Sequence, residues 1–153
     1  MKTAVAVLLC FGLPILAGAI GSIASVTAPE FYAALERPSW SPPGWIFGPV
    51  WTALYLMMGL AAFLVWRVRG WTTLLTFFAV HLAFNALWSW LFFAWRSGLW
   101  SFADIVLLWL MIGALIIGFW RIKPLAGALL VPYWAWVTFA SALNYDIWRR
   151  NGM

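Results

Sequence analysis

Charge is the scarcest property of this sequence. Only 8% of its 153 residues are charged, whereas 66% are hydrophobic and the mean hydropathy is +0.95. A soluble domain carries about 25% charged residues, so the composition excludes an ordinary soluble protein. The charged residues are separated by uncharged stretches at residues 3–29, 38–66, 70–95, 105–120 and 124–145. Most of these stretches supply the roughly 20 apolar residues that a membrane-spanning helix needs.

This pattern predicts an all-α membrane protein, with five transmembrane helices in one bundle and a long structured loop between the first two. The fourth stretch is short, but Asp104 near its start is expected to reach the lipid headgroups. The setting that we expect is a multi-pass protein of a bacterial inner membrane. The predicted elements of the single domain 1–153 are helices at about 4–26, 44–67, 71–95, 99–121 and 125–149, and a loop at 27–43.

The N-terminal stretch imitates a secretory signal peptide, because Lys2 precedes an apolar run that contains the small residues 17–19. The apolar run continues to about Val26, which is long for a signal peptide and sufficient for a span. We therefore expect an uncleaved first helix.

Cysteine and histidine each occur once, as Cys10 and His81. A single cysteine cannot form an intrachain disulfide, and we expect Cys10 to be a small core residue. No second histidine, cysteine or carboxylate is expected at the depth of His81, which argues against a metal site and against a Ser-His-Asp triad. No charged residue is expected deep in a span, so the sequence lacks the ionisable residues within the membrane that a proton pump needs. The sequence predicts no catalytic residue, no metal and no required cofactor.

The net charge is +5, yet the basic residues do not form a nucleic-acid patch. They lie singly or in pairs at the predicted helix ends, where Lys and Arg meet membrane lipid headgroups. We therefore expect membrane lipid as a partner and no nucleic acid. The positive residues divide five against four between the two membrane sides, which leaves the orientation open.

One connector in the sequence is long and stiff. Residues 27–30 have the form of a helix capping box, which predicts a short helix at about 28–36 outside the bilayer core. RPSWSPPGW follows at residues 37–45, and its prolines lower the entropy cost of holding one shape. The connector is either a rigid corner that orients the second span or a lid over one mouth of the bundle.

Tryptophan is abundant, with 14 residues. Eight lie near span ends, as expected for an interfacial aromatic belt. Six lie deeper, and helical spacing groups Trp51 with Tyr55, Trp88 with His81 and Asn85, and Trp136 with Phe139, Ala140 and Leu143. Such stripes form either packed core or a ligand site. Asn85 in mid-span needs a hydrogen-bond partner, for which His81 is the candidate.

Three segments resemble the tryptophan-rich sensory protein and mitochondrial translocator protein family, also called the peripheral benzodiazepine receptor family. They are FYAALERPSWSPPGWIFGPVWTALY at residues 31–55, FNALW at 84–88 and VPYWAWVTFASALNYDIWRRN at 131–151. The resemblance implies five transmembrane helices and a pocket, closed by the first loop, that binds porphyrin-type tetrapyrroles such as protoporphyrin IX and haem. It also implies sterols or other flat apolar molecules as ligands.

Spacing and resemblance together define the candidate ligand-binding residues. The family often has tryptophan at the position of Phe31, and that tryptophan is associated with light-dependent porphyrin breakdown, so we do not expect an enzyme here. The expected function is a binding and sensory protein, with a tetrapyrrole or sterol transporter and a porphyrin-degrading protein as alternatives. The candidate ligand-binding residues are Phe31, Trp40, Trp51, Tyr55, His81, Asn85, Trp88, Trp136, Phe139, Ala140 and Leu143.

Two further patterns concern sterols and assembly. Leu143, Tyr145 and Arg149 fit a short sterol-contact pattern, which also describes any helix that ends in Tyr and Arg at an interface. Pairs of small residues, Ala79 with Ala83 and Gly18 with Ser22, allow close helix contact. Because members of the family form dimers, the resemblance implies a homodimer.

Overall fold

The computed structural model describes residues 1–153 as a bundle of helices without strands. Five helical segments are long and apolar enough to span a membrane, which confirms the predicted fold class of a multi-pass membrane protein. The elements are α1 (Thr3–Ala24), α2 (Ala28–Ala34), a 3-10 turn (Gly44–Ile46), α3 (Phe47–Arg69), α4 (Thr73–Ser89), a π-helical turn (Trp90–Ala94), α5 (Gly98–Ile122) and α6 (Pro124–Asn151).

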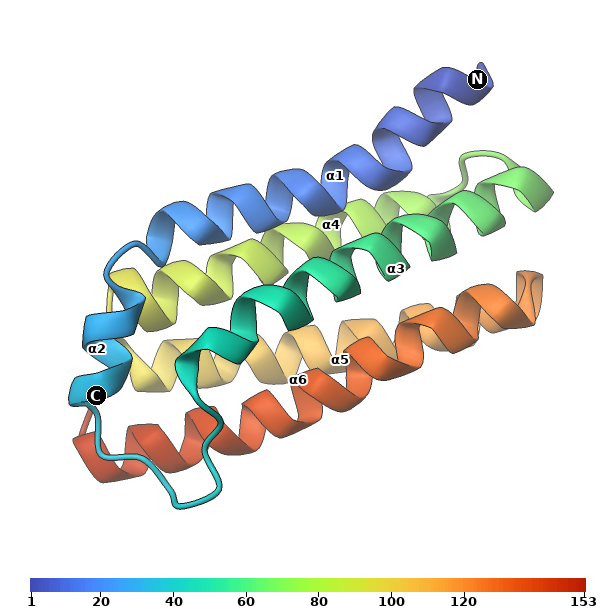
Figure 1. Ribbon diagram of the computed structural model, residues 1–153. Helices are drawn as coiled ribbons and strands as arrows, with labels where there is room; N and C mark the ends of the chain where they lie inside the picture. The colour runs from blue at the N-terminus through green and yellow to red at the C-terminus, as the bar shows by residue number, and fades with distance from the viewer.

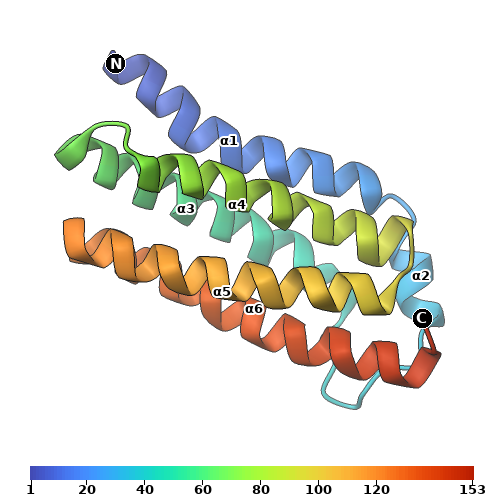
Figure 2. The same ribbon diagram turned by 180° about the vertical axis from the view of Figure 1, so that it is seen from behind.

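The five long helices run side by side along the bundle, while α2 and the loop after it cover one end (Figures 1 and 2). The C-terminus lies at this covered end and the N-terminus at the other (Figure 1). Asn151, the last residue of α6, holds the loop in place: the Glu36 backbone N–H donates to its Oδ1 at 3.0 Å, and its Nδ2 donates to the Glu36 carbonyl at 2.9 Å. The connector is therefore tied to α6.

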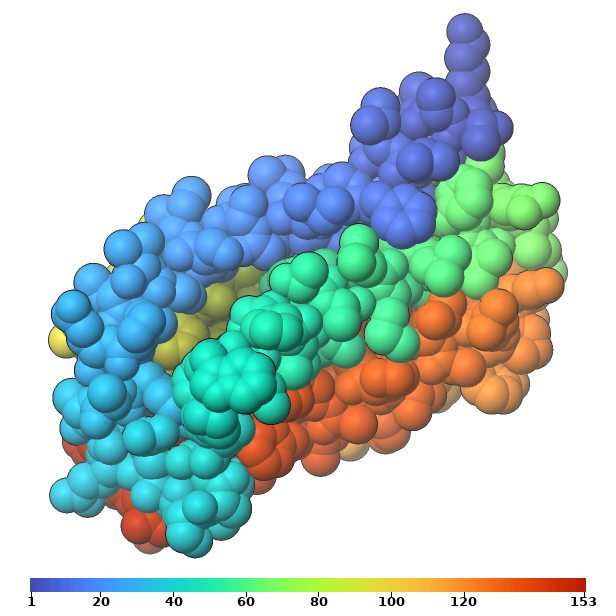
Figure 3. Space-filling view, in the orientation of Figure 1, coloured from blue at the N-terminus to red at the C-terminus, as the bar shows by residue number.

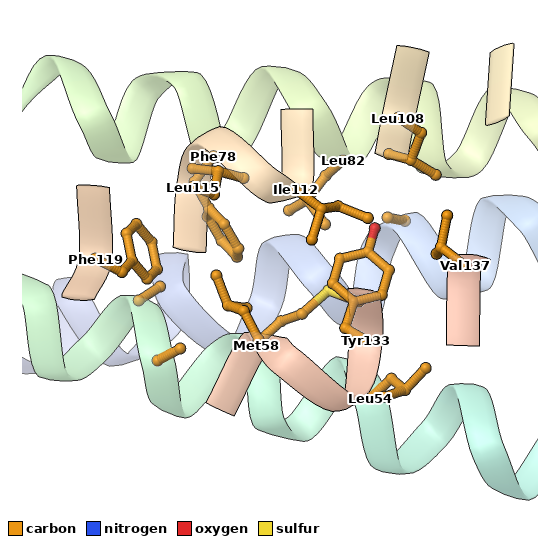
Figure 4. Packing of buried hydrophobic residues seen from close by; sticks show 14 of the residues in the cluster. Leu54, Met58, Phe78, Leu82, Leu108, Ile112, Leu115, Phe119, Tyr133 and Val137 are labelled. Atoms are coloured by element: carbon orange, nitrogen blue, oxygen red, sulfur yellow. The ribbon is translucent and has the colours of Figure 1, made fainter. Parts of the chain in front are cut away.

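Apolar side chains of α3, α4, α5 and α6 fill the middle of the bundle (Figure 4). Met58, Phe78, Ile112 and Phe119 are all fully buried there. These side chains interdigitate as packed core, and Tyr133 of α6 inserts among them with its hydroxyl group (Figure 4). α1 packs on α3 and α4 and contributes the small residues Cys10 and Ala17 to this core, as predicted for Cys10.

A glycine and a proline set the boundaries of two of the helices. Gly70 terminates α3 with φ 68°, a conformation that glycine adopts without strain. Pro124 occupies the first turn of α6, where its missing N–H costs nothing. The third span ends irregularly, which the sequence did not predict: α4 passes into a π-helical turn at Trp90–Ala94.

Asp104 corrects one expectation. Its side chain does not reach the lipid headgroups; it is 7% exposed, and its Oδ2 atom has no hydrogen-bond partner. The reason is its place on α5. The helix begins at Gly98, so Asp104 lies about 9 Å along the axis. It shares the inward face with Ser101, Ile105 and Leu108, which are also buried.

Candidate ligand-binding cleft

A cleft of about 1120 Å³ lies between α1, α3 and α4, beneath α2 and the loop. In the space-filling view it is visible as a hollow between α1 and α3, with α4 behind it (Figure 3). Ile15 of α1 and Leu56 of α3 line it and are themselves 54% and 51% exposed on the outer surface of the bundle. The cleft therefore opens sideways, on the surface that faces lipid.

α1 makes room for the cleft because its contacting residues are small. A Cβ atom on Gly18 would lie 2.7 Å from the Tyr55 ring, and one on Gly21 would lie 3.0 Å from the Ser89 hydroxyl oxygen. The Ser22 and Ser25 hydroxyls donate to backbone carbonyls of their own helix at 2.8 Å, so they need no other partner. Gly18 therefore contacts α3, whereas Ser22 is exposed.

Flat rings form the walls on α3 and α4. Trp51 stacks on Tyr55 with ring centroids 5.6 Å apart and an interplanar angle of 29°. Across the cleft, Trp88 meets Phe93 edge to face at 5.7 Å. All four rings line the cleft and are partly exposed. Such walls offer stacking surfaces to a planar guest.

A chain of hydrogen bonds forms the floor and joins three helices. The Tyr55 hydroxyl donates to Asn85 Oδ1 at 2.8 Å, and Asn85 Nδ2 donates to the Tyr133 hydroxyl oxygen at 2.8 Å. The Tyr133 hydroxyl lies 3.2 Å from His81 Nε2, and His81 Nδ1 lies against the Phe78 carbonyl. Asn85 does have partners in mid-span, but they are two tyrosines. The proposed direct pair with His81 was wrong, because Tyr133 lies between them.

The direction of this chain follows from its last member. A carbonyl only accepts, so the bond to Phe78 places the proton on His81 Nδ1. A buried imidazolium without a counter-ion would be costly, so the ring is neutral and Nε2 accepts from Tyr133. Tyr133 has then used its only proton, and it accepts from Asn85. Every bond in the floor points toward His81.

Trp88 is fixed by a residue that sequence reasoning missed. Its Nε1 donates to Asn144 Oδ1 of α6 at 2.9 Å, and Asn144 is 1% exposed. Tyr133, the centre of the floor, was missed as well. Both are polar residues inside the fifth predicted span, which is the signal that had identified Asn85.

Four of the eleven predicted binding residues line the cleft: Trp51, Tyr55, Asn85 and Trp88. His81 lies behind the floor and is fully buried. Phe31 does not line the cleft; its ring packs on Phe92 and Phe93 of the π-helical turn, with centroids 5.9 and 6.4 Å away.

Three of the remaining predicted residues, Trp40, Trp136 and Phe139, meet at a second place, where the loop contacts α6. Trp40 packs on Phe139 at 5.7 Å, and Phe47 packs on Trp136 at 5.8 Å. Ala140 and Leu143 are buried among core side chains. The structure does not bring these five predicted residues, Trp40, Trp136, Phe139, Ala140 and Leu143, to the cleft. As ligand contacts, all eleven stay predictions.

The sterol pattern is not assembled on one surface. Leu143 is 5% exposed and faces the bundle interior, whereas Tyr145 is 42% exposed. Arg149 donates to the Tyr145 hydroxyl at 3.2 Å, one turn away on the outer face. Only Tyr145 and Arg149 can therefore contact the same lipid-facing molecule.

The fold and the cleft together define a multi-pass integral membrane protein with a small-molecule-sized cavity walled by aromatic rings. The chain belongs to the TspO/MBR family, whose family model matches residues 6–149.

Several relatives match over most of their length. The chain is 41% identical to the "Tryptophan-rich protein TspO" of Chlorobaculum tepidum over 148 residues, covering 94% of each chain. It is 40% identical to the human "Translocator protein" over 127 residues, which is 80% of this chain and 75% of the human one. It is also 37% identical to the "Tryptophan-rich sensory protein" of Cereibacter sphaeroides over 122 residues, 80% of this chain and 77% of that one.

Proposed function

We propose that this protein binds porphyrin-type tetrapyrroles, such as protoporphyrin IX and haem, in the cleft between α1, α3 and α4, and acts as a membrane-embedded sensor of them. The observation that carries the proposal is the cleft itself, about 1120 Å³ with flat rings on two walls and an amide–phenol floor. Ligand sites for drug-sized molecules measure about 300–1,000 Å³ and combine apolar walls with a few polar groups. The names of the relatives, sensory protein and translocator protein, agree with such a role.

The tetrapyrrole is proposed as a ligand and not as a resident cofactor, and no chemical step is assigned to it. Sterols and other flat apolar molecules are the other ligand class that the walls suit, because stacking and apolar contact do not depend on a particular functional group.

Two tryptophan variants distinguish the cleft from the second aromatic cluster beneath the loop. Trp51→Ala removes a cleft wall and is expected to weaken protoporphyrin IX binding about tenfold, because a stacking ring and its apolar contact are lost. Trp136→Ala removes an equal ring that packs behind the cleft-lining Phe47 and does not itself line the cleft, and it is expected to change the affinity less than twofold. Binding is followed in detergent by the absorbance shift of the porphyrin.

Thermal unfolding of each variant shows whether the fold is retained. If Trp136→Ala weakened binding and Trp51→Ala did not, the ligand would lie under Trp40 and Phe139, and the assignment to the cleft would be wrong.

Transport is the second candidate function, and the sideways opening of the cleft favours it. Ile15 and Leu56 at the opening face lipid, so an apolar guest could exchange with the bilayer directly. Flux of porphyrin into sealed vesicles that contain the protein, above the flux into empty ones, would support transport. Binding without additional flux would leave the sensory role.

A homodimer through α4 belongs to this proposal, because Ala83 is exposed next to the partly buried Ala79. Because Cys10 is the only cysteine of the sequence, replacing it leaves a protein in which a single introduced cysteine can be tested for cross-linking. In a Cys10→Ala background, Ala83→Cys is expected to form a disulfide-linked dimer on mild oxidation. Ala53→Cys, on an exposed position of α3, serves as the control. Equal cross-linking of both variants would argue against α4 as the interface.

A further inference from the structure

One charged side chain, that of Arg37, lines the cleft. It lies in the loop directly after α2, at the covered end, whereas the floor groups Tyr55 and Asn85 are neutral and lie deeper. The polar groups of the cleft are therefore arranged in order, with a positive charge at its covered end and neutral hydrogen-bonding groups deeper inside.

Arg37 is held in place by an aromatic ring. Its guanidinium carbon lies 4.3 Å from the centroid of the Tyr32 ring. Tyr32 is itself fixed, because its hydroxyl donates to the Pro42 carbonyl at 2.8 Å and its ring packs edge to face on Phe47 at 5.5 Å. A cation–π contact of this kind uses no N–H group in a hydrogen bond and leaves the N–H groups of the guanidinium free to donate.

No protein acid neutralises this guanidinium. The structure contains one ion pair, between Arg150 and Asp146, and Arg37 makes no hydrogen bond to another residue. Neighbouring Glu36 uses its backbone N–H and carbonyl to bind Asn151, and its side chain forms no ion pair. A positioned, unpaired guanidinium at the covered end of an apolar cleft is suited to a carboxylate, which it can bind through two parallel hydrogen bonds.

We propose that Arg37 selects the ligand class of this cleft: flat apolar molecules that carry an acidic group at one end. The apolar body lies between Trp51 and Trp88, and the acid reaches the guanidinium at the covered end. Neutral flat molecules bind through the walls alone and more weakly. This inference rests on the proposed function, since it concerns the same cleft.

The test compares two ligands that differ only in charge. Protoporphyrin IX carries two carboxylic acids, and its dimethyl ester has the same ring with both acids capped. Wild-type protein is expected to bind the diacid about tenfold more tightly than the ester, because a charge-assisted hydrogen bond is lost in the ester. Arg37→Gln is expected to remove this difference while leaving the ester affinity unchanged. Raising the salt concentration should weaken binding of the diacid only.

Arg96→Gln is the matched control. Arg96 also lies over an aromatic ring, with its guanidinium carbon 4.6 Å from the centroid of Phe31, but it does not line the cleft. This variant should keep the preference for the diacid, and Arg37→Lys, which keeps the charge, should keep part of it.

The outcomes separate the two proposals. If wild type bound the diacid and the ester equally, or if Arg37→Gln weakened both equally, the role of Arg37 would be wrong and porphyrin binding would stand. If wild type bound neither molecule, the proposed function would fail and this inference with it.

Discussion

Replacing Gly18 with leucine is expected to weaken porphyrin binding about a hundredfold, because the new side chain overfills the cleft. Even a Cβ atom at this position would lie 2.7 Å from the Tyr55 ring. The ring must then move, which breaks its hydrogen bond to Asn85, and the rest of the leucine side chain occupies space between α1 and α3. The measurement is a porphyrin titration followed by absorbance.

Gly12→Leu is the matched control on the same helix. No atom lies within 4 Å of a Cβ built on Gly12, which faces outward. Leucine there should leave both the affinity and the thermal stability close to those of wild type. Unchanged porphyrin affinity in Gly18→Leu would show that the guest does not use this cleft.

Tyr133→Phe is expected to lower the free energy of unfolding by about 2 kcal/mol, because it leaves two buried polar groups without a partner. One is the Asn85 Nδ2 group, which donates to the tyrosine hydroxyl, and the other is His81 Nε2, which accepts from it. The phenyl ring keeps the packing in the core. Thermal unfolding in detergent measures the loss.

Tyr145→Phe removes a hydroxyl from the exposed face of the same helix and should cost less than about 0.5 kcal/mol. The double variant Asn85→Leu/Tyr133→Phe tests the coupling. Since each single variant already removes the hydrogen bond between Asn85 and Tyr133, the two losses should add to more than the double variant shows. Strict additivity would mean that the two side chains do not interact.

The five spans were predictable because their signal is strong and local. Few charges interrupt the apolar stretches, and a helix is the structure that satisfies its own backbone within lipid. Asn85 was identified as a residue that needs a partner by the same reasoning. Its partner could not be read from one helix, since Tyr133 reaches it from α6, 48 residues away in sequence.

The position of the cleft was less accessible to sequence reasoning. Spacing selected large rings, and three of the eleven candidates, Trp136, Phe139 and Trp40, pack on other rings beneath the loop. A cavity, however, also needs a wall where side chains are small. Gly18, Gly21 and Ser22 of α1 provide that wall, and glycine in an apolar span gives no sign of whether it faces lipid, a partner helix or a cleft.

The π-helical turn at Trp90–Ala94 was hidden for a similar reason. Its residues are as apolar as those of a regular helix, so the sequence predicted α-helix to residue 95. The extra residue in this turn accompanies an arrangement in which Phe93 lines the cleft while Phe92 is 2% exposed and stacks on Trp88 at 5.2 Å.

All hydrogen bonds in the floor of the cleft point toward His81, and this direction restricts which chemical groups of a ligand can lie against the floor. Because the Tyr55 proton is committed to Asn85, the phenolic oxygen has only lone pairs left for a molecule in the cleft. A guest that brings an N–H or O–H there gains a bond, whereas a carbonyl oxygen in the same spot is repelled. His81 does not line the cleft, but through Tyr133 and Asn85 it fixes the direction of the Tyr55 hydroxyl. It therefore determines which end of a ligand can lie against Tyr55.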